Sequence, residues 1–599
     1  MEINKKNNII VQIMLFISTL IIFTIINHNL YPMVQNIGGD EFSTIAISAF
    51  LWGEEWENVL SSSKYYGFGY SIFLTFIFRI TDNPLYIYRF MQLINSIINA
   101  GCVLICYKIM LKLLGKKEIG YCLLTSLAIA FLPGKFNYVI NEHMIIFLIW
   151  LSIYLLILLH ERDNKILYTV LLVLLLAYSL TIHTRMVLLI AVISSYIIVL
   201  FLKEKKKLVN FPIFFLGIFI GFGLINNVLI KNIQNKIWLQ ETSNTPLANT
   251  SEALIEQIFS RVEEFTSINS IKFSLMTMMS QLTTGNLFTV GILFISIVSA
   301  VVLCVLFFVK RVKIDYDIIV ISWICLFGVI LSVLGQVITW LPHFEKLNIE
   351  EINNAIVGGR VKVYLRYYFC YVGPLIMLFF IVLKEYNYWT YLKKYNWMFV
   401  FLFLLTAKFA LYKVYTNFNE YKINSSPTYG FFYPFGKLIG EEYLTQEVFG
   451  RMILITFIVF MLLLICLNRK KFTLLVSLVV VSFFVNYCSF NYTYNSPNSK
   501  KVFERNIGFY DIVKDVEKYG QLPKDIYLLD GEKSDVKLQF FLNKYSIKID
   551  FEEIDFNKVL ITQYKENIPD GCKVINVDSG GYICLKNEEL IQLFEKAGY

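Results

Sequence analysis

The sequence predicts an all-α polytopic membrane domain with about thirteen transmembrane helices, followed by a small C-terminal α/β domain. Hydrophobic residues make up 56% of the 599 residues and the mean hydropathy is +0.58, whereas charged residues make up only 17%. Soluble domains carry about 25% charged residues. Apolar runs of roughly 17 to 25 residues, long enough to cross a bilayer, recur from Ile9 to Ser489. We therefore expect an integral membrane protein.

The individual membrane helices are predicted from the apolar runs that lie between short polar breaks. The first run follows Lys5 and Lys6 and could belong to a signal peptide, but no small-residue cleavage site comes after it, so we expect it to remain as a helix. The predicted spans are residues 9–26, 85–111, 119–136, 143–160, 166–182, 186–202, 208–230, 287–309, 316–340, 367–383, 396–414, 450–467 and 472–490.

Lysine and arginine clusters predict the orientation of the chain. They occupy alternate breaks between the spans, and such clusters mark cytoplasmic loops. We therefore expect a plasma-membrane protein with a cytoplasmic N-terminus and an extracytoplasmic C-terminal domain. The net charge of +9 follows largely from this bias, so we do not interpret it as a nucleic-acid-binding surface. The basic clusters lie at residues 112–117, 162–165, 203–207, 310–313, 384–394 and 469–471, and the expected outward loops at 27–84, 231–286 and 341–366.

The C-terminal segment has a different composition from the rest of the chain. We expect a membrane domain over residues 1–492 and an extracytoplasmic α/β domain over residues 493–599, because helix-like stretches there alternate with short β-like runs. The predicted helices are residues 509–519, 535–545 and 588–597, and the predicted strands are residues 525–529, 558–562, 573–577 and 582–585.

The ten cysteines predict neither a metal site nor a disulfide scaffold. Eight of them lie in or beside predicted spans and no CxxC motif occurs, so we interpret them as packing residues. The last two strands flank a turn at Ser579-Gly580. This turn would place Cys584 opposite Ile575 rather than opposite Cys572, so we do not expect a disulfide between the two cysteines.

Two adjacent carboxylates stand in the first outward loop, in Gly38-Gly39-Asp40-Glu41. Ionisable groups near membrane depth are costly and usually face an internal cavity. The stretch Phe42 to Trp52 that follows is predicted to be an amphipathic helix lying in the membrane interface. Asp40 could simply cap that helix, and Glu41 could favour its positive end. Capping does not explain why the same loop continues into the aromatic and glycine-rich segment from Lys64 to Leu74.

Several short motifs together resemble the GT-C membrane glycosyltransferases, and in pattern most of all the protein O-mannosyltransferases and the lipid A aminoarabinose transferases. These enzymes use sugars linked to polyprenyl phosphate. Each motif is short, but their order and their outward placement match the family over most of the chain. The motifs are Asp40-Glu41, Tyr66-Gly67-Phe68-Gly69-Tyr70, Glu142 before a span, Tyr364-Leu365-Arg366-Tyr367-Tyr368 with Pro374, and Val536-Lys537-Leu538-Gln539-Phe540-Phe541-Leu542.

The resemblance implies a catalytic role for the three carboxylates. A sugar on a lipid phosphate already has a good leaving group, so the enzyme must deprotonate the acceptor hydroxyl and stabilise the departing phosphate. Asp40 is then the general base of an inverting transfer. Glu41 orients the loop, since adjacent residues at a helix start point in different directions. Glu142 either positions the acceptor or, as in some members of the family, contributes to a divalent-cation site. No His/Cys cluster predicts metal ligands, so we name none and leave a divalent cation open as a cofactor.

Basic residues at the outer ends of the spans are candidates for binding the donor phosphate. Arg366 is the first choice because a guanidinium can bind phosphoryl oxygens through two hydrogen bonds, although an arginine at a span end can also merely extend toward the interface. Arg185 and His183, which close the outer end of the fifth span, come second. Lys64, Lys362 and Arg360 are weaker candidates, since outward loops usually carry solvated charges.

Aromatic residues near these groups are predicted to line the sugar or lipid pocket, although interfacial tyrosines also anchor membrane proteins. The candidates are Tyr65, Tyr66, Tyr70 and Tyr367.

The predicted function is transfer of a monosaccharide from a polyprenyl-phosphate-linked donor to a hydroxyl of a cell-envelope polysaccharide, lipid or protein, with the bilayer as a further partner. A transporter or flippase of lipid-linked sugars is an alternative, but it would be expected to show internal repeats and ionisable residues at several depths. An oligosaccharide ligase or polymerase is a second alternative. Its catalytic residues would be expected in a late outward loop such as 415–449, which contains Glu441 and Glu442.

Overall fold

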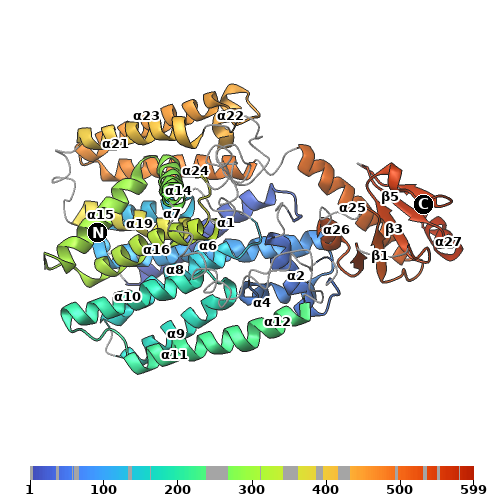
Figure 1. The fold of residues 1–599 in the computed structure, drawn as a ribbon, viewed down its shortest axis with the longest axis horizontal. Coiled ribbons are helices and arrows are strands. Elements are labelled where there is room, and N and C mark those ends of the chain that lie inside the picture. Colours follow the sequence, from blue (N-terminus) through green and yellow to red (C-terminus); the bar gives the residue numbers. More distant parts are fainter. Residues whose placement is uncertain are drawn as a thin grey trace.

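In the computed structural model, a bundle of long helices carries a small α/β domain at one end (Figure 1). The N-terminus lies at the opposite end of the bundle from that domain. The structure describes residues 5–34, 40–56, 59, 67–132, 138–161, 164–237, 268–310, 312–340, 362–385, 396–415, 418, 432–492, 497–530, 536–549, 554–578 and 580–599.

Each of the predicted spans overlaps a helix, which confirms the all-α membrane domain. Within the described residues, nine helices are long and apolar enough to cross a bilayer by themselves, and a bent pair adds a tenth. Three further helices, α7, α19 and the apolar part of α24, are shorter. The helices are α1 (Lys5–His28), α6 (Pro84–Leu114), α7 (Ile119–Ala130), α8 (Glu142–Glu161), α9 (Lys165–Ile182), α10 (Met186–Glu204), α11 (Phe211–Leu224), α12 (Lys231–Ile237), α14 (Ile268–Phe288), α15 (Ile292–Phe308), α16 (Tyr316–Trp340), α19 (Phe369–Glu385), α21 (Asn396–Phe409), α23 (Gln446–Asn468) and α24 (Phe472–Tyr492).

The centre of the bundle is formed by α19, which is buried from Phe369 to Leu383 and packs against α6, α8, α15 and α16. Helices α9 to α11 lie along one side of these central helices, and α21 and α23 lie along the opposite side (Figure 1). The bent pair α14 and α15 turns by 114° at Gly291. Gly291 has a φ of +84°, and a Cβ there would lie 2.4 Å from the ring of Phe460, so both the backbone and the space require glycine.

The outward loop after α1 contains α2 (Asp40–Trp52), α4 (Gly69–Thr75) and α5 (Ile77–Ile80). The sequence predicted that residues 42–52 form a helix lying in the membrane interface with one face exposed. The helix forms, but its position differs from this prediction. Residues 41–49 of α2 are all buried inside the protein, because α2 packs against α4, α5 and α26 of the C-terminal domain. Only its last turn, Leu51 and Trp52, is exposed. The N-terminal end of α2, which bears the two carboxylates, is therefore surrounded by other parts of the protein.

The C-terminal domain is a five-stranded sheet with helices, as the alternating pattern predicts. The strand order is β2-β1-β3-β5-β4, with β1 parallel to β2 and β3, and with β5 antiparallel to β3 and β4. Strand β2 was not predicted because it has only three residues. The elements are α25 (Pro497–Glu517), β1 (Asp525–Leu528), α26 (Val536–Phe541), β2 (Ser546–Lys548), β3 (Val559–Thr562), β4 (Lys573–Asn576), β5 (Tyr582–Leu585) and α27 (Glu588–Lys596).

The register of the last hairpin differs by one residue from the prediction. Cys584 pairs with Val574, not with Ile575. The Val577 amide donates to the Gly581 carbonyl (2.9 Å), so the loop that this bond closes has three residues rather than two, and Gly580 in that loop has a φ of +90°. Cys572 and Cys584 are both free thiols, in agreement with the expectation that they form no disulfide.

Specific contacts attach the C-terminal domain to the bundle. The Trp56 indole donates to the backbone carbonyl of Asn543 (2.8 Å), and the ring of Tyr88 packs edge-on against Phe540. Two ion pairs, Lys524 with Glu55 (2.6 Å) and Lys544 with Asp82 (2.7 Å), add to them at the rim. The domain therefore docks on the loop after α2 and on the segment that leads into α6.

Candidate active site

Arg366 lies at the centre of a cluster of charges near the end of the bundle that carries the C-terminal domain. Its guanidinium forms an ion pair with Asp40, the first residue of α2, and its Nε lies 2.5 Å from Oε1 of Glu142, the first residue of α8. The three side chains are between 8% and 16% exposed. The fold thus brings together three of the predicted site residues that are far apart in the sequence.

A second arginine completes this Arg366 cluster, which we define as Asp40, Glu142, Arg185 and Arg366. Nη2 of Arg185 donates to the same Glu142 oxygen at 3.1 Å, and its guanidinium carbon lies 5.0 Å from the ring centre of Tyr367. Burial by itself lowers the pKa of Arg366, but Glu142, Tyr364 and Asp40 more than offset this, so the net pKa is raised and the guanidinium stays charged. The two carboxylates and the two arginines balance in formal charge.

The hydrogen-bonding capacity of the cluster is not used up. Oε2 of Glu142 and Nε and Nη1 of Arg185 are buried and have no hydrogen-bond partner among the described residues. Most buried polar atoms in proteins do have a partner, so such atoms call for an explanation. The N–H groups of two arginine nitrogens, next to a second arginine, are suited to an anion with several oxygens, such as a phosphate.

Glu41 points away from this cluster, as expected for the neighbour of Asp40 at a helix start. Its buried carboxylate accepts hydrogen bonds from the hydroxyl of Tyr88 (2.6 Å) and from the backbone N–H of Val139 (2.9 Å). These contacts join α2 to α6 and to the segment just before α8. Glu41 therefore fixes the position of α2, and through it the position of Asp40.

The aromatic and glycine-rich segment packs on the loop that carries Arg185. Gly67 has a φ of +133°, and a Cβ at this position would lie 2.2 Å from the carbonyl oxygen of Ile182. The Tyr178 hydroxyl donates to the Gly69 carbonyl at 2.9 Å. These glycines are required because the backbone of the segment touches the end of α9, three residues before Arg185.

His183 lies in the same loop, between α9 and α10. Its Nδ1 accepts a hydrogen bond from the backbone N–H of Arg185 (3.2 Å). Burial, together with the nearby Arg185, lowers the pKa of His183 well below its usual range. The lowered pKa disfavours the charged form of the ring, and Nδ1 is engaged with the Arg185 backbone, so a role of His183 in phosphate binding stays a prediction.

The predicted pocket tyrosines fall into different environments. Tyr367 lies partly exposed beneath Arg185 and packs against Tyr364 with ring centres 5.4 Å apart. Tyr70 is fully buried and its hydroxyl donates to Asn95, so it joins α4 to α6 instead of lining an open pocket. Lys64, Tyr65, Tyr66 and Arg360 lie outside the described residues.

Two residues near Arg366 have environments that the sequence reasoning missed. The hydroxyl of Tyr364 lies 3.5 Å from Nη1 of Arg366, and its place two positions before the arginine in the same motif could have suggested this contact. Lys362 was predicted to be solvated, yet it is 1% exposed, with Nζ 3.4 Å from the carbonyl oxygen of Lys413. Burial lowers the pKa of Lys362 to about 8.

The described residues contain no group of three or more His, Cys, Asp or Glu side chains placed to hold a metal ion. Asp40 and Glu142 are the carboxylates nearest to such a role. Both are bound to Arg366, and Glu142 is also bound to Arg185. A cation placed between them would meet two guanidinium groups, so this donor set does not fit a divalent ion.

Comparison with known proteins identifies the fold. No protein-family model matches the chain, and no curated protein matches its sequence. Among solved structures, ArnT from Cupriavidus metallidurans bound to undecaprenyl phosphate has a TM-score of 0.51 at 9% identity, over 96% of this chain and 98% of ArnT. The same protein in the apo state has a TM-score of 0.43 at 10% identity. The likeness to the first structure extends over both the bundle and the C-terminal domain, so the chain has the GT-C fold that the sequence motifs predict.

Proposed function

We propose that this protein is an inverting glycosyltransferase that moves a monosaccharide from a polyprenyl-phosphate-linked donor to a hydroxyl of a cell-envelope acceptor, on the outer face of the membrane. The observation that carries the proposal is the Arg366 cluster, in which two arginines and two carboxylates meet and hydrogen-bonding groups of Arg185 and Glu142 remain unused. The ArnT structure with the same fold is bound to undecaprenyl phosphate, which supports a lipid phosphate as the donor carrier.

Arg185 and Arg366 are the proposed phosphate ligands. Negative charge builds on the phosphate as the bond to the sugar breaks, and guanidinium groups already in place stabilise that charge without reorganisation. The N–H groups on Nε and Nη1 of Arg185, which have no partner among the described residues, can bind phosphoryl oxygens without breaking an existing hydrogen bond. Nε and Nη1 of Arg366 already bind Glu142 and Asp40, so a phosphate that takes either of these groups must loosen one of those contacts.

This exchange suggests how Asp40 acts as the base. A donor phosphate that draws Arg366 toward itself weakens the ion pair with Asp40, and the freed carboxylate can accept a proton. The acceptor oxygen then attacks the anomeric carbon while its proton passes to Asp40, and the bond from the anomeric carbon to the phosphate oxygen breaks. Polyprenyl phosphate leaves, and the single displacement inverts the anomeric centre. Glu142 holds both arginines throughout.

Transport of lipid-linked sugars is less well supported. In the described part of the chain, the buried ion pairs lie at the ends of helices. Glu142 is the first residue of α8 and His160 lies in its last turn. Lys112 lies in the last turn of α6 and Asp317 in the first turn of α16. A translocation path would be expected to place charges at intermediate depths. For a ligase or polymerase, Glu441 and Glu442 are the late-loop candidates, and they lie just after the short helix α22 (Tyr433–Ile439), where Glu442 is exposed.

One substitution tests the base. Asparagine caps helices about as well as aspartate but cannot accept the proton. Because Arg366 loses the charge of its partner, we expect purified Asp40→Asn to lose some stability but to remain folded. Per folded molecule it should transfer sugar about 10² to 10⁴ times more slowly, which is the usual contribution of general-base catalysis. The measurement is transfer from a panel of undecaprenyl-phosphate hexoses and deoxyaminosugars to envelope extracts. Asp570→Asn, in the C-terminal domain, is the control. Wild-type transfer by Asp40→Asn would refute the mechanism.

A further inference from the structure

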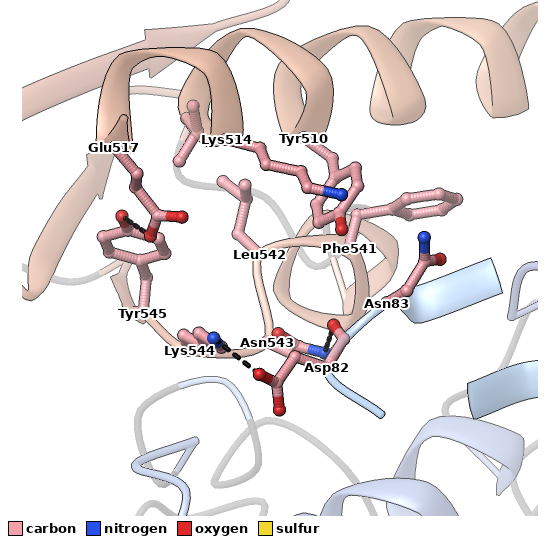
Figure 2. Close-up of a pocket in the computed structure, with 11 residues that line it drawn as sticks. Asp82, Asn83, Tyr510, Lys514, Glu517, Phe541, Leu542, Asn543, Lys544 and Tyr545 are labelled. Carbon is pink, nitrogen blue, oxygen red and sulfur yellow. Dashed lines mark hydrogen bonds and ion pairs between the residues drawn. The ribbon is translucent and has the colours of Figure 1, made fainter. Parts of the chain in front are cut away.

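A pocket of about 230 Å³ lies where the C-terminal domain meets the bundle (Figure 2). One wall is formed by Asp82 and Asn83, which lead into α6. The other walls come from α25, through Tyr510, and from the segment after α26. Ligand pockets occur preferentially at domain boundaries and start at about 300 Å³. The size of this pocket thus suits a group no larger than about one sugar ring.

The polar side chains that line the pocket are largely fixed by contacts with one another. Lys544 forms an ion pair with Asp82 (2.7 Å), and the Tyr545 hydroxyl donates to Glu517 (2.5 Å), as Figure 2 shows. The Asn543 amide donates to the Asp82 carbonyl (2.8 Å). These contacts cross between the two domains and between α25 and the segment after α26. The pocket is therefore a built part of the domain boundary and not a gap between loosely associated parts.

The chemistry of the lining favours a neutral ligand with several hydroxyl groups. Two carboxylates, Asp82 and Glu517, are balanced by two ammonium groups, Lys514 and Lys544. A free anion would be repelled by the first pair and a cation by the second. Ammonium and amide groups donate hydrogen bonds and carboxylates accept them, which matches hydroxyl groups that do both. The Tyr510 ring, with the Lys514 ammonium 5.4 Å from its centre, offers an apolar face beside these groups.

The pocket is connected to the residues that follow Asp40 on α2. Asn543, in the pocket wall, accepts a hydrogen bond from Trp56, and the Trp56 ring stacks on Phe42 with ring centres 5.7 Å apart. Phe540, one residue before the pocket residue Phe541, packs on Tyr88, which donates to Glu41. All the rings in these two chains are buried. A ligand in the pocket therefore touches the wall that holds α2 in place.

We infer that this pocket binds a sugar unit of the acceptor, so that the acceptor is a glycan or a glycosylated molecule. The inference rests on the proposed function, because that function requires an acceptor on the side of the C-terminal domain. The donor does not fit this role, since its phosphate is assigned to Arg185 and Arg366. Sugar bound between the domains would hold the acceptor while a neighbouring hydroxyl reaches Asp40.

The test measures sugar binding and does not depend on transfer. Full-length protein in lipid nanodiscs is examined by saturation-transfer NMR with methyl β-glucoside, methyl α-mannoside and N-acetylglucosamine. We expect at least one of these probes to bind, and Tyr510→Ala and Lys514→Met each to weaken that binding at least about fivefold, as loss of a typical hydrogen bond or packing contact does. Lys514 is exposed, so its replacement leaves the fold intact. Tyr564→Ala, at an exposed tyrosine away from the pocket, is the matched control.

The outcomes separate this inference from the proposed function. Asp40→Asn should bind the probe as the wild type does, even where it has lost transfer. If no probe binds to a wild-type protein whose transfer depends on Asp40, the pocket inference fails and the proposed function stands. Equal binding by wild type, Tyr510→Ala and Lys514→Met would also overturn the inference. Displacement of the probe by inorganic phosphate would show an anion site and would overturn it too.

Discussion

Two clusters of charge, each built around a buried carboxylate, lie at opposite ends of helix α8, and they differ in how completely they are paired. At the first residue of the helix, Glu142 belongs to the Arg366 cluster. At the other end, Nδ1 of His160 lies 3.2 Å from Asp317, and Lys112 pairs with the second oxygen of Asp317 and with Glu161 (3.1 Å). We name this the Asp317 cluster: Lys112, His160, Glu161 and Asp317. Residues 142 and 160 of one α-helix lie ~27 Å apart.

The buried polar groups of the Asp317 cluster are paired with one another and with neighbouring side chains. Both carboxylate oxygens of Asp317 are used, and the second ring nitrogen of His160 is 3.3 Å from the Tyr196 hydroxyl. These contacts join α6, α8, α10 and α16. In the Arg366 cluster, by contrast, three buried polar atoms of Glu142 and Arg185 have no partner among the described residues. A buried polar group without a partner costs about 1–3 kcal/mol. The first arrangement serves stability, and the second is the one suited to a ligand.

The comparison assumes that the two clusters face opposite sides of the membrane, and this can be tested in an all-or-none experiment. Lys206 lies over the ring of Tyr316, next to Asp317, whereas α26 of the C-terminal domain packs against α2, the helix that begins with Asp40. Single cysteines at Lys205 and at Asp570, in a background without the partly exposed Cys488 and Cys572, should be labelled by a membrane-impermeant maleimide from opposite sides. Labelling of both from one side would overturn the predicted orientation. Detergent-solubilised protein, in which both should react, is the control.

The Asp317 cluster should affect stability and not turnover. Asp317→Asn removes the charge that pairs with the partly buried Lys112, and breaking a buried ion pair typically costs 3–5 kcal/mol. Because Lys112 keeps its contact with Glu161, we expect a loss of about 3 kcal/mol, with unchanged transfer per folded molecule. Chemical unfolding in detergent and single-turnover assays measure the two effects. The control is Glu447→Gln, which breaks an exposed pair with Arg451 that should contribute less than about 1 kcal/mol. If Asp317→Asn were as stable as the wild type, the Asp317 cluster would not stabilise the fold, and the proposed difference between the two clusters would be wrong.

Substitutions in the Arg366 cluster should affect turnover more than stability. Arg366→Lys keeps a positive charge but loses the planar group that reaches Asp40 and Glu142 in different directions. A hydrogen bond to the donor phosphate should contribute about 1.5–3 kcal/mol, so turnover per folded molecule should fall by about 10- to 100-fold, whatever stability is lost with the contacts to Asp40 and Glu142. Arg451→Lys, at an exposed arginine, is the control. Unchanged turnover at both saturating and limiting donor would exclude Arg366 from the phosphate site.

The helices could be predicted from the sequence because a long apolar run permits few alternatives in a bilayer. Features that depend on backbone detail could not. The hairpin register differs by one residue because the loop closed by the Val577–Gly581 hydrogen bond has three residues, not two. Helix α2 was predicted to lie in the interface because its pattern is amphipathic. In the structure α4, α5 and α26 bury it, and the sequence of α2 carries no sign of those partners.

The candidate site could be predicted as separate residues but not as a network. Asp40, Glu142 and Arg366 were each found from motifs, yet nothing in the motifs indicates that one guanidinium binds both carboxylates. His183 was named as a candidate phosphate ligand without knowledge of its burial, which lowers its pKa and which the sequence does not reveal. Lys362 was ranked as solvated for the same reason. In each case the missing information is the set of neighbours contributed by distant segments.

Lys362 provides the last prediction, because it is a buried cation, four residues before Arg366 in the sequence, whose pKa is low enough for it to titrate. Its pKa is lowered to about 8 by burial, whereas an unfolded lysine titrates near 10.4. Between these values the unfolded chain binds more protons than the folded one, so the free energy of unfolding rises with pH in this window. Lys362→Met should abolish this rise. The variant should be more stable than the wild type at pH 7, by at most about 3 kcal/mol, and the difference should vanish above pH ~10.5. Chemical unfolding across this pH range measures both curves, with Lys596→Met, at an exposed position, as the control. Parallel curves for wild type and Lys362→Met would mean that the ammonium is solvated in the folded protein.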